Sequence, residues 1–236
     1  HADSANVTWG FKPFGGDSSA VRDQLKGVRQ VQATQKAFAA ILEDGSVVTW
    51  GDAGYGGDSS AVRDQLKGVL QIQATPNGAF AAILADGSVV TWIHEGYGGD
   101  SSAVRDQLKG VEQIQATYFA FAAILEDGSV VTWGDAECGG DSSAVRDQLK
   151  GVQQIQATLN GAFAAILADG SVVTWGYPDV GGGSSAVRDQ LRGVQQIQAT
   201  NRAFAAILKD GSVVAWGDAE CGGDSSAVRD QLRGVQ

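Results

Sequence analysis

The sequence predicts an all-β protein of the β-propeller type, with about six blade equivalents. A segment that runs from Trp-Gly through a short variable loop to GGDSSAVRDQL recurs almost letter for letter six times. One tryptophan marks each copy, and these six account for every tryptophan of the chain: Trp9, Trp50, Trp92, Trp133, Trp175 and Trp216. Their spacing alternates between 41 and 42 residues, and a period of about 40 to 45 residues with strand-like content is typical of a four-stranded blade.

The length of 236 residues predicts a single domain over 1–236, since closed β architectures of about 200 to 250 residues are common. The repeats are expected at 1–27 (partial), 28–68, 69–110, 111–151, 152–193 and 194–234. The first residues align with the middle of a hairpin, and the last ones with the start of another first strand. We therefore expect a segment of a longer array, whose ring closes imperfectly or with neighbouring sequence.

Three strands are predicted in each full copy. In residues 28–68 they are Val28 to Thr34, Ala37 to Leu42 and Ser46 to Trp50, each rich in β-branched or aromatic residues and bounded by turn signals. The step Asp44-Gly45 between the last two indicates a tight hairpin, because glycine adopts the positive φ that such turns need.

The middle strand, AFAAIL, is apolar on both alternating faces, so we expect sheets that pack against it on both sides. The repeat tryptophans and one phenylalanine per copy are predicted to fill the core between the sheets. These phenylalanines are Phe38, Phe80, Phe121, Phe163 and Phe204.

The segment GGDSSAVRDQL leaves two structures open. Ser18 or Ser19 could cap a one-turn helix that ends near Leu25, or AVRDQL could be a short outer strand; we favour the helix or an irregular turn. Arg22, Asp23 and their copies could form salt bridges between neighbouring repeats or remain solvated surface charges.

The charge argues against nucleic acid as a partner. The formal net charge is −10 and the sequence pI is about 4.5, and such a field repels phosphate backbones. No apolar run approaches the roughly 18 to 20 residues of a membrane span, so we expect a soluble chain without direct membrane insertion. The compartment is not indicated. Cys138 and Cys221 stand in repeats two units apart and are expected to be free thiols.

Catalytic and cofactor chemistry is not predicted. The only two histidines are His1 and His94, too few for a histidine-based triad or a zinc cluster. Six equal Ser-Ser pairs indicate turn residues rather than one nucleophile. The repeated aspartates, such as Asp17, do not match the spacing of a calcium-binding loop. We therefore predict no enzyme, cofactor or metal, and no small-molecule ligand, and we take the sequon Asn6-Val7-Thr8 as accidental.

Each copy contains the elements V-x-x-I-x-A, then A-I-L-x-D-G-S-V-V-T-W-G, then a glycine-containing loop. This pattern resembles the repeat of the regulator of chromosome condensation family, in a wording similar to versions abundant in algal proteomes. The resemblance covers essentially the whole chain. It implies a propeller, most often of seven blades, that presents loops to partner proteins; members include a nucleotide-exchange factor for a nuclear GTPase and a bacterial inhibitor of β-lactamase. The chain departs from the family where phenylalanine replaces a common histidine before the A-L strand, and where Ile93 follows Trp92 in place of glycine.

Two loops of each copy vary while the rest hardly changes. One follows the IQAT strand, the other follows Trp-Gly, and both are expected at the end of the blade opposite the Asp-Gly turns. They carry residue types enriched at interface centres, so we predict that they bind a protein partner whose identity the sequence does not give. The candidate residues are Phe11, Lys12, Phe14, Lys36, Tyr55, His94, Tyr97, Tyr118, Phe119, Leu159, Tyr177 and Arg202.

The leading prediction for function is thus a protein-binding scaffold, and one form of this role is a subunit of a larger, algal-type complex. Two alternatives stay open: a guanine-nucleotide exchange factor or inhibitor-type propeller, and a structural array that spaces other domains. Neutral drift of exposed loops would also produce the variation.

Overall fold

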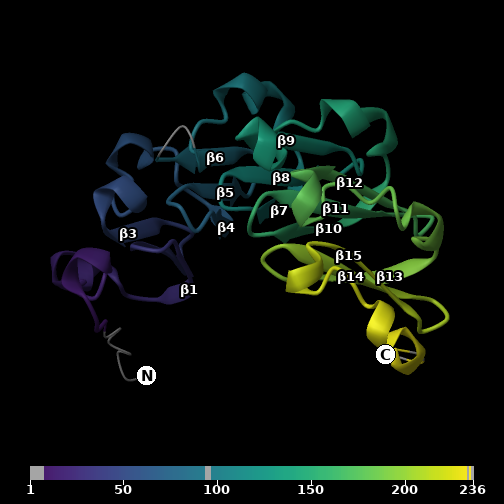
Figure 1. Ribbon diagram of the computed structural model, residues 1–236. Helices are drawn as coiled ribbons and strands as arrows, with labels where there is room; N and C mark the ends of the chain where they lie inside the picture. The colour runs from purple at the N-terminus through teal and green to yellow at the C-terminus, as the bar shows by residue number, and fades with distance from the viewer. Residues whose placement is uncertain (1–7, 94–96, 233, 235–236) are drawn as a thin grey trace. The chain divides into compact units, whose positions relative to one another are not determined.

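The computed structural model describes residues 8–93, 97–232 and 234, and they form β-strands joined by short helical turns (Figure 1). The chain divides into two compact units, His1–Ile114 and Gln115–Gln236, and each is considered by itself. The single domain over 1–236 therefore stays a prediction.

Five three-stranded antiparallel sheets, one per full repeat, confirm the three predicted strands. The strand order in each sheet follows the sequence: β1-β2-β3, β4-β5-β6, β7-β8-β9, β10-β11-β12 and β13-β14-β15. In the first unit the strands are β1 (Val28–Ala33), β2 (Ala37–Leu42), β3 (Val47–Gly51), β4 (Val69–Ala74), β5 (Phe80–Leu84), β6 (Val89–Trp92) and β7 (Val111–Ala116), which ends past the division. In the second they are β8 (Ala120–Leu125), β9 (Val130–Gly134), β10 (Val152–Thr158), β11 (Ala162–Leu167), β12 (Val172–Gly176), β13 (Val194–Ala199), β14 (Ala203–Leu208) and β15 (Val213–Gly217).

The segment after each Gly-Gly pair forms a short helix and not an outer strand. Each described sheet therefore has three strands, instead of the four of a typical propeller blade. These helices are η2 (Ser19–Gln24), η4 (Ser60–Val62), η6 (Ser102–Gln107), η8 (Ser143–Gln148), η10 (Arg188–Gln190) and η12 (Ser226–Gln231). The predicted serine cap is wrong in its chemistry: Ser18 makes no capping bond. Asp17 Oδ1 accepts the bond from the Ser19 N–H instead, at 3.0 Å.

The variable loop after Trp-Gly also contains a single turn in most repeats. These turns are η1 (Lys12–Phe14), η3 (Ala53–Tyr55), η7 (Ala136–Gly140), η9 (Pro178–Val180) and η11 (Ala219–Cys221). η7 is a π-type turn and the others are 3-10 turns.

The middle strands β5, β8 and β11 are buried on both faces, as predicted, whereas β2 and β14 are half-buried at several positions. Consecutive sheets within a unit pack face to face. In the first unit, Ala39 and Ile41 of β2 lie in one cluster with Ile72 and Phe80 of the following sheet. In the second, Ala122 and Ile124 join Ile155 and Phe163 in the same way, and a third cluster follows. The small alanines allow the backbones to approach closely, and the larger side chains fill the remaining space.

Phenylalanine and tryptophan stack within every described sheet. Phe80 and Trp92 are cross-strand partners whose ring centroids lie 4.9 Å apart at 15°, and the other four pairs lie at 5.1 or 5.2 Å. Phe38 is only half-buried, whereas its four copies are fully buried.

Trp9 contradicts the prediction that all six tryptophans belong to the core. Its side chain is 85% exposed, whereas the other five are between 4 and 8% exposed. Within the described residues no phenylalanine stacks on Trp9, whereas each of the other five tryptophans has such a partner.

The stacked rings pack closely against the Gly-Gly pair of the preceding repeat. Trp92 Nε1 donates a hydrogen bond to the Gly56 carbonyl at 3.3 Å, and a Cβ on Gly56 would lie 2.2 Å from the Phe80 ring. Trp175 and Trp216 donate to Gly139 and Gly181 in the same manner, both at 3.1 Å. Glycine is required here for the close approach and for the left-handed backbone, with φ +100° at Gly56.

At the other end of the strands, the Asp-Gly turns connect neighbouring repeats. Asp169 Oδ1 accepts from the N–H and the hydroxyl of Ser171, at 2.8 and 2.6 Å. The Gly170 carbonyl then accepts from the N–H of Val194, the first residue of the next sheet, at 2.9 Å. One turn thus closes its own hairpin and fixes the start of the following strand.

A pair of hydroxyl groups links the third strand to the helix that follows it. Thr132 and Ser142, both buried, are hydrogen-bonded at 3.1 Å, and four other copies make the same bond: Thr8 to Ser18, Thr49 to Ser59, Thr91 to Ser101 and Thr174 to Ser184. In the last repeat Ala215 stands in place of the threonine.

The copies of Arg22 and Asp23 do not pair between repeats among the ion pairs of the described residues. Instead, Arg105 Nη2 donates to Gln65 Oε1 of the preceding repeat at 3.3 Å, on the exposed surface. The charges of this segment are therefore largely solvated, as the second alternative proposed.

Two glycine substitutions should distinguish the destabilisation caused by overpacking from that caused by backbone strain. Gly181→Ala places a Cβ 2.5 Å from the Phe204 ring at φ +109°, whereas Gly222→Ala has φ +99° but nothing within 4 Å. Because the backbone strain is similar, we expect Gly181→Ala to lower the free energy of unfolding by about 1–3 kcal/mol more than Gly222→Ala, through overpacking. Urea denaturation measures both; equal losses would contradict the packing role.

The Asp-Gly turns should weaken in acid. The hydroxyl and the N–H of Ser171 hold the pKa of Asp169 below its ordinary value. Because the folded pKa is the lower one, the stabilisation is present above the unfolded pKa of about 4 and is lost as the pH falls through the folded value. We expect the difference in urea midpoint between the wild type and Asp169→Asn to shrink as the pH falls from about 5 towards 2; a constant difference would refute this linkage.

Ala215→Thr should add the hydroxyl bond that the last repeat lacks. A threonine there would face Ser225 with the same spacing of ten residues as in the other repeats, and we expect a gain of about 0.5–1.5 kcal/mol in the free energy of unfolding. Ala215→Val is the matched control, since it adds the same bulk without the hydroxyl. Thermal or urea unfolding checks the pair, and an equal effect of both variants would show that no bond forms.

Candidate protein-interaction surface

The two variable loops of a repeat lie together, at the end of the strands opposite the Asp-Gly turn, as predicted. In the first unit, Asp52 N donates to the Lys36 carbonyl at 2.9 Å, and Thr34 Oγ1 donates to the Tyr55 carbonyl at 2.8 Å. In the second unit, Asp135 N donates to the Phe119 carbonyl at 3.0 Å. The repeat therefore presents one composite loop surface.

The loops after the first strands also bond from repeat to repeat. Gln35 N donates to the Pro76 carbonyl at 2.9 Å in the first unit. In the second, Tyr118 N donates to the Leu159 carbonyl at 2.7 Å, and Asn160 N donates to the Asn201 carbonyl at 3.1 Å. These backbone bonds hold loops of different sequence in one repeated conformation, which lets side chains change without loss of the framework.

Four predicted residues of the first unit form one group, which we call the Lys36 cluster: Phe11, Phe14, Lys36 and Tyr55. The rings of Phe11 and Phe14 meet edge to face at 4.9 Å. Lys36 Nζ lies 5.1 Å from the Phe14 centroid and 4.1 Å from the Tyr55 centroid, so a cation is held between two aromatic faces.

The Lys36 cluster is open to solvent. Phe11 is 66% exposed and Phe14 is 41% exposed, and the neighbouring Lys12 is an exposed cation that pairs with Asp17 at 3.6 Å. Large aromatic side chains that are exposed and gathered in one patch are typical of interaction sites, and aromatic residues are enriched in interface centres.

The second unit contributes a separate group, the Tyr118 row, made of Tyr118, Phe119 and Leu159. The rings of Tyr118 and Phe119 lie 6.1 Å apart, and all three side chains are half-buried. Tyr177 is 43% exposed. Arg202 is held by Asp218, with Nε 2.7 Å from Oδ2, so its charge is already neutralised within the surface.

Two further residues were predicted for this surface. Tyr97 is half-buried beside Gly98. His94 lies outside the described residues.

Sequence reasoning missed the polar residues that shape these loops. Asp52 Oδ1 accepts from the Gly54 N–H at 2.8 Å, and Asp218 Oδ1 accepts from the Glu220 N–H at 2.9 Å, so these carboxylates cap the loop turns. Thr34 and its copies tie the loop to the first strand. The signal was available, because Asp and Thr recur at fixed positions beside residues that vary.

The loops offer little reactive chemistry. Burial, with the charge of Asp135, raises the pKa of the Cys138 thiol to about 11, so this group is a neutral thiol rather than a thiolate nucleophile. Cys138 and Cys221 are both free. Within the described ranges, no three His, Cys, Asp or Glu side chains gather as metal ligands, and no helix is long and apolar enough to cross a membrane.

Comparison with solved structures supports the fold. The chain resembles Prp20p of Saccharomyces cerevisiae, with a TM-score of 0.55 at 17% identity over 83% of this chain and 58% of that one. The ectodomain of the Arabidopsis thaliana receptor kinase ACR4 gives 0.55 at 16% identity, over 80% of this chain and 68% of that one. Human WBSCR16 gives 0.50 at 18% identity, over 80% and 61%.

No family model matches the sequence, and neither does a curated protein. The chain spans less than two thirds of the yeast structures, 58% and 57%. The chain thus has the fold of a β-propeller, built of repeats like those of the regulator of chromosome condensation family, with five three-stranded sheets in the described part.

Proposed function

We propose that this chain is a non-catalytic scaffold that binds a protein partner through the variable loops at one end of its blades. The observation that carries the proposal is the Lys36 cluster, because three separate segments converge there to hold exposed aromatic rings around one lysine. A side chain fixed before binding loses less conformational freedom when a partner arrives.

The loop surface combines a constant frame with changing side chains. Asp caps, Thr bonds and the backbone bonds between loops recur, whereas the side chains between them change from repeat to repeat. This division supports recognition, since each repeat offers a different anchor at the same structural position.

Regulation of a GTPase is the second candidate. Prp20p, which has a similar fold, was described together with its binding to Gsp1p and histones, and Kap60 was solved bound to the same yeast protein. A propeller can thus serve several protein partners, and nucleotide exchange deserves a direct assay.

Photo-crosslinking tests the docking face. A photoreactive residue at Tyr118 or Phe14 should capture a defined partner in stoichiometric yield, whereas the same group at Glu126 or Glu43, at the Asp-Gly end, should not. We expect Tyr118→Ala/Phe119→Ala or Lys36→Ala to weaken the captured complex about tenfold or more, as for an interface anchor, measured with the purified partner.

The matched control is Glu126→Ala, which removes a side chain at the opposite end and should leave affinity unchanged. Equal capture from both ends, or a complex indifferent to the loop variants, would refute the docking face and favour a spacer array. Release of labelled nucleotide from a small GTPase at catalytic amounts of this chain would instead support the exchange factor.

A further inference from the structure

Two cations stand at the same position of their repeats but are held in different ways. Lys36 and Arg202 each directly precede an A-F-A-A-I-L strand, and in both repeats an aspartate follows Trp-Gly, Asp52 or Asp218. The backbones match, because Asp52 N donates to the Lys36 carbonyl at 2.9 Å and Asp218 N to the Arg202 carbonyl at 3.0 Å. Arg202 Nε lies 2.7 Å from Asp218 Oδ2, whereas Lys36 takes part in none of the ion pairs found among the described residues.

The residue before the Gly-Gly pair accounts for this difference. In the two repeats whose loops meet at Lys36 it is aromatic, Phe14 and Tyr55, and Lys36 Nζ lies 5.1 and 4.1 Å from the two ring centroids. In the corresponding repeats of the second unit it is Val180 and Cys221. Neither side chain offers a cation an aromatic face, so the guanidinium of Arg202 pairs with its own aspartate instead.

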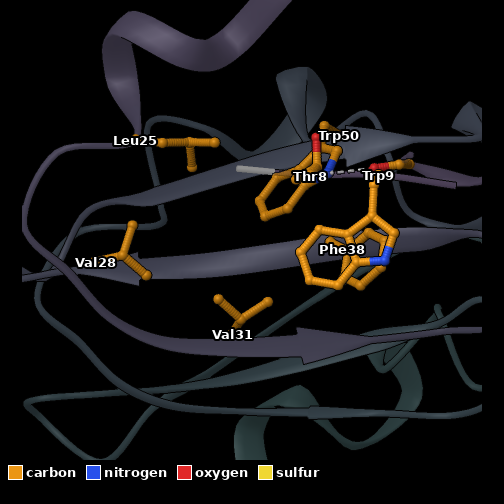
Figure 2. Close-up of a pocket in the computed structure, with 8 residues that line it drawn as sticks. Thr8, Trp9, Leu25, Val28, Val31, Phe38 and Trp50 are labelled. Carbon is orange, nitrogen blue, oxygen red and sulfur yellow. Dashed lines mark hydrogen bonds between the residues drawn. The ribbon is translucent and has the colours of Figure 1, made fainter. Parts of the chain in front are cut away.

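The protein core fixes the two rings around Lys36. Each ring directly precedes a glycine whose carbonyl accepts a hydrogen bond from a core indole: Gly15 from Trp50 at 3.1 Å (Figure 2), and Gly56 from Trp92 at 3.3 Å. The position of the rings, and of the ammonium group between them, is therefore set before a partner arrives. The neighbouring Asp52 is engaged elsewhere, since its Oδ1 accepts from the Gly54 N–H at 2.8 Å.

The charges of the variable loops differ between the two units. The loops around Lys36 contain Lys12 and Lys36 against a single acidic residue, Asp52. In the second unit the variable loops contain one cation, Arg202, and several acidic residues: Asp135, Glu137, Asp179, Asp218 and Glu220. A carboxylate of a partner is repelled by the acidic loops and attracted to Lys36, which favours one binding register.

We propose that the Lys36 cluster binds an acidic peptide segment of the partner, with an Asp or Glu carboxylate paired to Lys36 Nζ. This inference rests on the docking face proposed above and names the chemistry that one part of it recognises. The rings hold the ammonium group by its charge and accept none of the strong hydrogen bonds that it can donate to a carboxylate. Arg202 is the satisfied counterpart, because its carboxylate is supplied by the same chain.

Selection from a random peptide library displayed on phage tests the proposal on the full chain. The wild type should enrich peptides that contain Asp or Glu, although the net charge of −10 by itself favours basic ones. Lys36→Gln should lose this enrichment. Lys12→Gln is the matched control and should keep it: the variant removes the same charge from the same loops, but Lys12 is already paired with Asp17 at 3.6 Å.

Fluorescence anisotropy with one selected peptide measures the size of the effect. Replacement of its acidic residue by the corresponding amide should weaken binding about fivefold, the upper end for a surface ion pair. Lys36→Gln should give the same loss, and Lys36→Arg, which keeps the charge, should retain binding. The difference between the wild type and Lys36→Gln should shrink as salt is added, and the amide peptide should bind both equally.

Two results would overturn the carboxylate pairing alone. One is selection of neutral or basic peptides only, and the other is an acidic peptide that binds Lys36→Gln as well as it binds the wild type. If the peptides selected in either case are lost in Tyr118→Ala/Phe119→Ala, the docking face itself stands. Absence of any enrichment over the uncoated support would overturn both the pairing and the docking face.

Discussion

The packing of a Phe-Trp stack on the glycine pair of the preceding repeat is the contact on which the rest of this structure depends. The stack fills the space between two sheets, and the indole nitrogen donates its proton to the glycine carbonyl. This bond satisfies the one polar atom that the buried indole carries, so burial costs no unpaired donor. Both glycines and both rings must be present together, which explains why these positions hardly vary.

That contact also separates the parts of a repeat that must stay constant from those that can change. Strands, glycine pairs and Asp-Gly turns each contact a neighbouring repeat, so a substitution there disturbs two sheets. In the variable loops the fixed contacts are made by backbone atoms and by a few capping Asp and Thr side chains. The framework therefore tolerates an aromatic, a proline or a lysine in the loops, and a binding surface can develop without loss of stability.

The sequence predicted the strands, the Asp-Gly hairpins and the position of the loops, because local periodicity and turn chemistry determine them. It did not predict the Asp17 cap in place of Ser18, since both residue types cap helices and only the three-dimensional structure shows that Ser18 is engaged with Thr8. Nor did the sequence reveal the Lys36 cluster, whose members lie in three different loops. Contacts between distant segments leave no local pattern.

Trp9 shows that a repeated motif alone does not determine whether a side chain is buried. Its neighbours in sequence match those of Trp50, yet one indole is exposed and the other is buried. The difference arises from position in the array, because a residue in a repeat is buried by the strand beside it and not by its own motif. The same reasoning applies to Val31 and Ile72: equivalent positions have one chemistry but two environments.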